Sequence, residues 1–433
     1  MGTKIPLKRE LGLLEVTLSG VGIILGAGIY ALIGRGAGLA GNALWLSFAI
    51  SAVIAVFTGL SYAELSAMFP RAGAEYEYVK GAFGKRTAFV IGWLIILSGI
   101  IGASAVALGF AGYASALAGI DPALSGIDHS LFAAGLIIGL SLLLTRGIRI
   151  SALFAAVFTL VEMGGLLLII AIGVPYLGEV NYLEMPLGFP GILSAAALVF
   201  FAYIGFEDVV KLAEETREPE KNIPRGLLAA MAISILLYIL VSVSAVSVAG
   251  WEALAASEAP FAAVAGRALG GWASVLLSGI ALFATANTVL LMLLASSRIT
   301  YGMADAGDLP AFLGHVHERS RTPLLATLAV GTAACLFTLA GDIGFVAELT
   351  NFTLFLTFSV INATVILLRV RFPGLRRPFA VPGSVRGIPI LPVAGVVASV
   401  ALLAQLDRVV LGLGAVLVVL GSGYALTRIP RRA

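Results

Sequence analysis

Two segments of the chain place glycines and polar groups inside long apolar stretches. The first is the run SGVGIILGAGIY at residues 19–30, and the second is the run FFAYIGFED at residues 200–208. A glycine inside a helix costs about 1 kcal/mol relative to alanine. Each run therefore favours either close helix packing or a break in the helix, which would expose backbone N–H groups to an anion and backbone C=O groups to a cation.

Glu162 is a carboxylic acid inside the apolar stretch 151–176. It follows Arg149 by about a dozen residues, which at 1.5 Å per residue places it roughly 18 Å deep, near the middle of a bilayer. An ionised carboxylate at that depth is costly unless it is paired or hydrated. We predict that Glu162 carries a proton. A protonated acid with a purely structural role, and a site for a cation or a substrate amine, are the alternatives.

Other polar side chains accompany these features. Glu207 and Asp208 are adjacent and would point to different faces of a helix, and Lys211 follows Glu207 by one turn. We predict a gating or proton-linked role for Glu207, with an intrahelical pair to Lys211 as the alternative. Asn287 interrupts the apolar stretch 271–303, and it either hydrogen-bonds between helices or lines an ion pathway.

Apolar segments long enough to cross a membrane carry all of these groups. Of the 433 residues, 60% are hydrophobic and 12% are charged, whereas a soluble chain has about 25% charged residues. A helix needs roughly 20 apolar residues to cross a bilayer. The sequence predicts an all-α integral membrane protein with about twelve transmembrane helices, at residues 12–34, 43–69, 87–118, 131–146, 151–176, 191–211, 226–249, 271–303, 323–341, 345–369, 388–406 and 409–428.

The basic residues indicate how these spans are oriented. Alternating connections place all 27 lysines and arginines on one side of the membrane except Arg35, Arg267 and Arg408. The positive-inside rule then predicts a multi-pass protein of the cell membrane with both termini cytoplasmic. This distribution accounts for the net positive charge through membrane topology, so we expect no nucleic acid as a partner. The expected partner of the apolar surface is the lipid bilayer.

The two glycine-containing runs fall in the first and the sixth predicted spans. Five is an odd number, so a repeat of five spans is inverted relative to the membrane, and paired broken helices in inverted repeats form the binding sites of transporters. Half-helix N-termini bind a carboxylate, and unwound carbonyls bind an ammonium group. Because an α-amino acid head group carries both charges, the pattern predicts an amino acid or a related small amine as the substrate.

Several motifs, spread over nearly the whole chain, resemble the amino acid–polyamine–organocation superfamily of permeases. Residues 26–29 (GAGI) are similar to the turn in its first span, and residues 200–206 (FFAYIGF) to its sixth. The loops at residues 62–76, 214–224 and 368–379 are similar to the loops that follow its second, sixth and tenth spans. These motifs are typical of the superfamily and do not indicate one substrate.

The resemblance implies a five-plus-five inverted-repeat fold with broken helices 1 and 6. Residues 1–370 would form the ten-helix transport core, and residues 371–433 would add two further transmembrane helices. The implied site has Gly26, Ala27 and Gly28 at the substrate carboxylate, the carbonyls near Ile23, Ile24, Phe200 and Ala202 at its amine, Phe201 as an aromatic lid, and Ile204 in a mostly apolar pocket. Glu207 aligns with an acid of the arginine/agmatine exchangers that is thought to respond to pH.

Position 162 departs from this resemblance. Proton-coupled members commonly place a lysine here, and its ammonium group occupies the sodium position of sodium-driven relatives. Glu162 reverses the charge. The residue is still protonatable, but a carboxylate could instead attract a sodium ion or a cationic substrate group.

We therefore expect a secondary active transporter that moves an amino acid by alternating access and is coupled to protons through Glu162 or Glu207, with Asn287 in the ion site. The bundle of spans 1, 2, 6 and 7 would rock against the rest. An amino acid or polyamine exchanger without net ion coupling is one alternative, and a non-transporting membrane sensor is another. The sequence contains no Ser/His/Asp, Cys/His or metal-ligand pattern, so we expect no enzyme activity, no metal and no cofactor.

Overall fold

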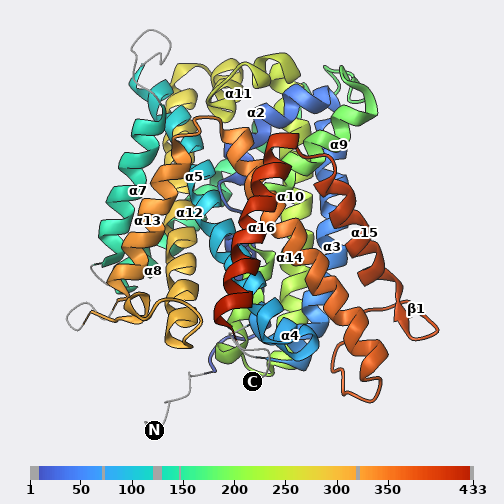
Figure 1. The fold of residues 1–433 in the computed structure, drawn as a ribbon. Helices are drawn as coiled ribbons and strands as arrows, with labels where there is room; N and C mark the ends of the chain where they lie inside the picture. Colours follow the sequence, from blue (N-terminus) through green and yellow to red (C-terminus); the bar gives the residue numbers. More distant parts are fainter. Residues whose placement is uncertain (1–8, 71–73, 120–128, 146–147, 318–321, 430–433) are drawn as a thin grey trace.

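The computed structural model describes residues 9–70, 74–119, 129–145, 148–317 and 322–429, and helices make up nearly all of it (Figure 1). The helices of the first half are α1 (Leu13–Ile24), α2 (Gly28–Ala40), η1 (Gly41–Ala43), α3 (Leu44–Met68), α4 (Ala74–Phe83), α5 (Lys85–Ala118), α7 (His129–Thr145), α8 (Ile148–Gly173), η2 (Val174–Tyr176), α9 (Gly188–Val199), η3 (Phe200–Tyr203) and η4 (Phe206–Glu215).

The second half continues the helical pattern and adds one small hairpin. Its elements are α10 (Pro219–Ala255), α11 (Pro260–Leu269), α12 (Gly271–Asp305), η5 (Ala311–Gly314), α13 (Leu324–Thr338), α14 (Ile343–Arg371), β1 (Ser384–Val385), β2 (Ile388–Pro389), α15 (Ile390–Leu403) and α16 (Arg408–Arg428). The strands β1 and β2 pair antiparallel.

Each predicted span coincides with a helix or with a broken pair of helices. The first span consists of α1 and α2, the sixth consists of α9, η3 and η4, and a single helix occupies each of the others. Within the described ranges, eight helical segments are long and apolar enough to cross a membrane, and α1, α7, α13 and α15 are shorter apolar helices. The prediction of an all-α membrane protein is confirmed.

Both breaks lie within the glycine-containing runs of the sequence. In the first span, α1 ends at Ile24 and α2 begins at Gly28, and the Gly26 N–H donates to the Ile24 carbonyl at 2.7 Å instead of continuing the helix. In the sixth span, Gly205 adopts φ +114° between η3 and η4, a region of backbone conformation that residues with a Cβ rarely enter.

The glycine run of the first span also serves close packing. A Cβ atom on Gly20 would lie 2.8 Å from the Ala230 Cβ of α10, and one on Gly22 would lie 2.7 Å from the Thr159 side chain of α8. These two glycines therefore let α1 approach its neighbours, whereas Gly26 and Gly28 lie at the break. The two interpretations of the run, packing and breakage, apply to different parts of it.

The helix packing repeats itself with a shift of five spans. The helix α5 packs on α12, α3 on α10, α7 on α13 and α2 on α9, so each of these spans contacts its own counterpart in the other half. Other contacts also occur in equivalent pairs. The contact of α1 with α10 corresponds to that of α9 with α3, and the contact of α5 with α14 corresponds to that of α12 with α8. This is the packing expected of the inverted repeat.

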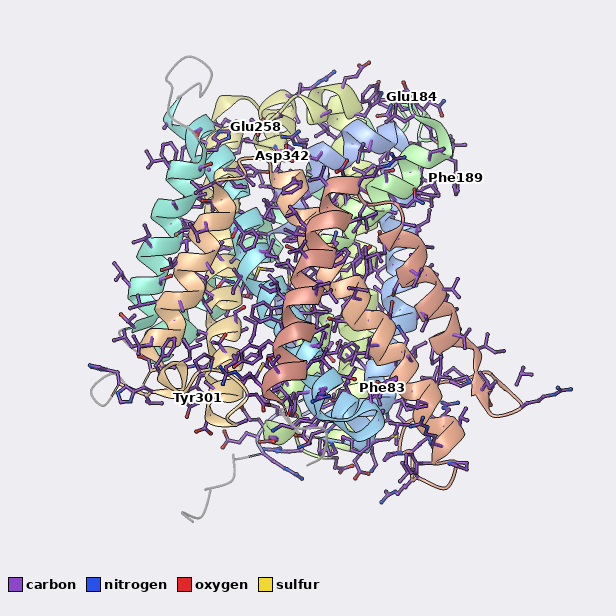
Figure 2. All side chains as sticks on the ribbon, viewed as in Figure 1. Phe83, Glu184, Phe189, Glu258, Tyr301 and Asp342 are labelled. Atoms are coloured by element: carbon purple, nitrogen blue, oxygen red, sulfur yellow. The ribbon has the colours of Figure 1, made fainter. Side chains whose placement is uncertain are left out.

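The two ends of the helical body differ in charge. Figure 1 shows α4 at one end and α11 at the other, and Figure 2 places Phe83 at the α4 end and Asp342 at the α11 end. Buried Glu64 meets Arg369 and Arg377 at the end of α3, and Lys85 pairs with Asp308 at 2.9 Å where α5 begins.

The two described arginines with contacts at the other end are Arg35, which pairs with Asp342 at 3.2 Å, and Arg267, which donates to the Ala249 carbonyl. These five basic residues lie at the ends that the charge pattern assigns to them. Several side chains of the predicted basic face, those of Lys4, Lys8, Arg71, Arg146, Arg149, Arg319, Arg321, Arg431 and Arg432, lie outside the described residues.

Candidate substrate-binding site

A cavity of about 100 Å³ lies where the two breaks meet, and it extends to Glu75 of α4. The helices α5, α12 and α14 complete its wall. Most of the predicted site residues line this cavity: Ile23, Gly26, Gly28, Phe201, Ala202, Ile204, Glu207 and Asn287. The predicted residues Ile24, Ala27, Phe200 and Glu162 are buried but do not line it.

The N-terminus of α2 presents an uncapped helix end at this cavity. No side chain caps it, and the Ala27 N–H donates to the hydroxyl of Thr288 on α12 at 2.9 Å. Gly28 lines the cavity so tightly that a Cβ atom there would lie 2.8 Å from the Ala202 Cα. The positive end of the helix dipole favours an anion at this position.

The chain's own carboxylate occupies the corresponding end of the other broken span. The Gly205 N–H donates to a carboxylate oxygen of Glu207 at 2.9 Å, at the start of η4. Glu207 is buried and lines the same cavity. Of the two half-helix N-termini in the described breaks, that of α2 is therefore the one that no carboxylate of the described residues occupies.

The backbone carbonyls of the breaks are held by Tyr238 of α10. Its hydroxyl lies 2.7 Å from the Ile24 carbonyl oxygen and 2.9 Å from the Ala202 carbonyl oxygen. Because one hydroxyl carries a single proton, it can donate to only one of them at a time, and each carbonyl keeps a second lone pair. Tyr238 therefore bridges the two breaks, and the sequence interpretation did not identify it.

The two adjacent phenylalanines face different ways. Phe201 lines the cavity, and its ring would lie 3.1 Å from a Cβ atom on Gly28. Phe200 instead packs its ring at 4.9 Å from Phe355 of α14. This geometry suits Phe201 to the predicted role of a lid and makes Phe200 a core residue.

Glu162 lies on the face of α8 that meets the first broken span. Thr159 contacts Gly22 of α1, Gly165 is close to the Tyr30 hydroxyl, and that hydroxyl donates to the Glu162 backbone carbonyl at 2.8 Å. The carboxyl group is 1% exposed, and neither of its oxygens has a hydrogen-bond partner among the described residues. The Oδ1 of Asn287, which lines the cavity, also has no partner in the described part of the chain.

A group of titratable side chains that includes Glu75 of α4 also lines the cavity. Glu75 is 3% exposed and accepts a hydrogen bond from the Tyr62 hydroxyl at 3.3 Å. Lys211 pairs with Asp208, not with Glu207 as the alternative interpretation expected. The sequence interpretation missed Glu75 as a site residue, although the loop motif at residues 62–76 contains it.

The burial of Glu75 predicts that the stability of the folded chain depends on pH. Burial raises the pKa of its carboxyl group above the ordinary 4.5, and Lys211 opposes this shift. The folded chain thus binds the proton more tightly than the unfolded chain, so stability falls as pH rises from about 4.5 through the folded pKa. We expect Glu75→Gln to flatten this fall, measured as the midpoint of thermal unfolding at a series of pH values. Glu77→Gln on the same helix is the control, and an unchanged slope in Glu75→Gln would contradict the assignment.

Comparison with known proteins places the chain in a family. The family model described as amino acid permease matches residues 11–419. The chain therefore belongs to the amino acid permease family, within the superfamily that the motifs predicted.

Individual relatives agree with this assignment. The branched-chain amino acid permease of Bacillus subtilis is 33% identical over 89% of this chain and 85% of its own length. The methylthioribose transporter of the same organism is 31% identical over 89% of this chain and 86% of its own. A vacuolar cationic amino acid transporter 4 of Arabidopsis thaliana is 34% identical over 84% of this chain and 64% of its own. These relatives are transporters, which confirms the prediction of a multi-pass membrane protein that is not an enzyme.

Proposed function

We propose that the chain is a secondary active transporter that moves an amino acid across the cell membrane by alternating access. The observation that carries this proposal is the pair of broken spans, which bring the N-terminus of α2 at Gly28 together with Ile23 and Ala202 at one cavity. The α2 end would hold the substrate carboxylate, and the carbonyls near Ile23 and Ala202 would hold its ammonium group. Phe201 would cover the bound head group.

The relatives differ in the substrate that their names give, so the side-chain pocket decides which amino acid is carried. In this chain the pocket wall is mostly apolar, with Ile95 of α5 and with Leu291 and Ile299 of α12. Residues 1–370 would form the transport core, and α15 and α16 would lie outside it.

A second cavity on the α11 side supports alternating access. It has a volume of about 440 Å³ and is lined by Arg35, Asp342 and Glu348. Leu198 lines this cavity and Phe201, three residues later, lines the first one, so the broken sixth span passes between the two. The rocking of spans 1, 2, 6 and 7 would connect the binding site first with one cavity and then with the other.

Contacts on the α11 side hold the first cavity closed in that direction. The Tyr113 hydroxyl donates to the Tyr30 carbonyl at 3.1 Å and accepts from the Phe261 N–H at 3.3 Å. The rings of Tyr30 and Phe261 meet edge to face at 5.0 Å. These contacts join α2, α5 and α11, so we assign the present conformation to the state whose cavity faces the α4 end. By the positive-inside rule, that end and both termini would be cytoplasmic.

Proton coupling is assigned to Glu162. Its buried carboxyl group has no partner within the described residues, and the neighbouring residues Thr159 and Gly165 contact the first broken span. Such a group is stable in the neutral form when the site is dry and can ionise when a neighbouring cavity admits water. Movement of α1 would thus change its protonation, and Asn287 and Glu207 would line the path of the ion. Binding of a sodium ion by the same carboxylate is an outcome that the experiment distinguishes.

Uptake into proteoliposomes tests this function directly. The purified chain is reconstituted and supplied with labelled amino acids and polyamines, with and without imposed pH and sodium gradients. Accumulation driven by a pH gradient supports the proposal, exchange without either gradient indicates an uncoupled exchanger, and sodium-driven accumulation indicates a sodium symporter. Failure of every substrate to accumulate or exchange would remove the transporter assignment.

The variant Glu162→Gln tests the coupling group alone. Glutamine keeps the shape of the side chain but cannot release a proton, so we expect loss of accumulation driven by a pH gradient with retention of substrate exchange. Glu258→Gln, at an exposed acid near α11, is the matched control and should accumulate substrate normally. Proton-driven accumulation at the normal level in Glu162→Gln would exclude this residue as the proton carrier.

A further inference from the structure

The hairpin of β1 and β2 stands out from the helical body at the edge formed by α15 (Figure 1). Val385 and Ile388 form a cross-strand pair, and Arg386 and Gly387 form the two-residue turn between them with φ +51° and +83°. Two consecutive residues with positive φ are typical of a tight type I′ turn, which matches the twist of the strands. The turn therefore holds Arg386 at the tip of a short, regular hairpin.

The apolar side chains of this hairpin continue a surface of α15 that faces lipid. The helix begins directly after β2, and its exposed apolar residues recur on one face. These residues are Ile390, Val393, Val397 and Val400. Val385 is 59% exposed and Ile388 is 46% exposed, just beyond the end of that face. The hairpin thus lies where the hydrocarbon of the bilayer gives way to the head groups.

The charge of the surrounding segment is entirely positive. Residues 371–390 contain four arginines and neither an aspartate nor a glutamate. Arg377 is turned inward to Glu64, whereas Arg371, Arg376 and Arg386 are exposed. Arg376 meets Glu220 at 3.3 Å, and no carboxylate of the described residues pairs with Arg371 or Arg386.

The geometry points to a docking surface for anionic phospholipid, formed by Val385, Arg386 and Ile388 of the hairpin together with Arg371 at the end of α14, the helix that contacts β2. The apolar pair inserts between acyl chains, and the guanidinium groups bind the phosphate of the head groups bidentately. Basic residues beside a membrane-inserted segment favour anionic lipid by about 1 kcal/mol each, which is about fivefold in binding. This surface anchors the loop between α14 and α15 and does not depend on the cargo of the central cavity.

Quenching of a fluorophore by brominated lipids tests the proposal with the full chain. The fluorophore is attached to a cysteine at Ser384→Cys in a Cys335→Ser background, and the protein is reconstituted in phosphatidylcholine with increasing brominated phosphatidylglycerol or brominated phosphatidylcholine. We expect phosphatidylglycerol to bind at least about fivefold more tightly than phosphatidylcholine at this position. Equal quenching by the two lipids would overturn the proposal.

Variants separate the contributions of the arginines from those of the apolar pair. The double variant Arg371→Gln/Arg386→Gln should bring the ratio of the two binding constants close to one, while Arg408→Gln, an exposed arginine at the start of α16, should leave it unchanged. Val385→Ser should weaken quenching by both lipids equally, because it removes insertion and keeps the charges. A phosphatidylglycerol preference that survives the double variant would contradict a head-group site on this hairpin.

Discussion

Replacing Gly28 by alanine is expected to reduce amino acid uptake by about 100-fold while the protein stays folded. The added Cβ atom would lie 2.8 Å from the Ala202 Cα and 3.2 Å from the Ala202 nitrogen. Backbone atoms cannot move aside as the end of a flexible side chain can, so the two breaks must separate. Separating the two breaks would misalign the α2 N-terminus, which we assign to the substrate carboxylate, and the carbonyls, which we assign to its ammonium group.

Initial rates of uptake as a function of substrate concentration measure this effect. The loss should appear in kcat/KM, and the midpoint of thermal unfolding should change little because the rest of the helix packing is untouched. Gly164→Ala is the matched control, since a Cβ atom there meets nothing within 4 Å and alanine favours a helix. Uptake by Gly28→Ala at the rate of the control would show that the close approach of the two breaks is not needed for transport.

The elements of the fold could be predicted from sequence because the evidence for them is local. A stretch such as residues 43–69 indicates its own membrane crossing by length and apolar character, and α3 occupies it at Leu44–Met68. The breaks were predictable for the same reason, since Gly26 and Gly205 each lie within the segment that they interrupt.

The partners that complete the site could not be predicted because they are distant along the chain. Thr288 accepts from the Ala27 N–H across 261 residues, and Tyr238 reaches the Ile24 carbonyl across 214 residues. A threonine or tyrosine inside an apolar stretch gives no sign of its partner in a single sequence. Only the packing of α10 and α12 against the breaks brings these side chains there.

The partner of Lys211 shows how one backbone angle changes a side-chain assignment. Helical spacing allowed a pair between Glu207 and Lys211. Gly205 has a positive φ, and η4 begins at the next residue, Phe206. The carboxylate of Glu207 therefore turns back and accepts a hydrogen bond from the Gly205 N–H. Asp208 is then the acid that meets Lys211. The direction of an acid next to a break follows from the geometry of the break, which the sequence pattern does not specify.

The largest expected loss of stability comes from Glu64→Ala at the end of α3. Glu64 is 1% exposed, and its carboxylate accepts hydrogen bonds from Arg369 and from the Val381 N–H at 2.7 Å. Arg377 adds a second guanidinium group at 3.4 Å. Alanine would leave two largely buried arginines without their counter-ion, and breaking a buried pair in this way costs about 3–5 kcal/mol.

Thermal unfolding in detergent measures this loss, with Glu220→Ala as the control. Glu220 pairs with Arg376 at 3.3 Å, but the Arg376 side chain is 83% exposed and that of Glu220 is 42% exposed, so its removal should cost less than about 1 kcal/mol. A double-mutant cycle of Glu64→Gln with Arg369→Gln then tests the pair itself, because two variants of one interaction should destabilise less together than the sum of their separate effects. Additive losses would mean that Glu64 stabilises the chain through Arg377 and Val381 instead, and that α3 and α14 are joined at this end by other contacts.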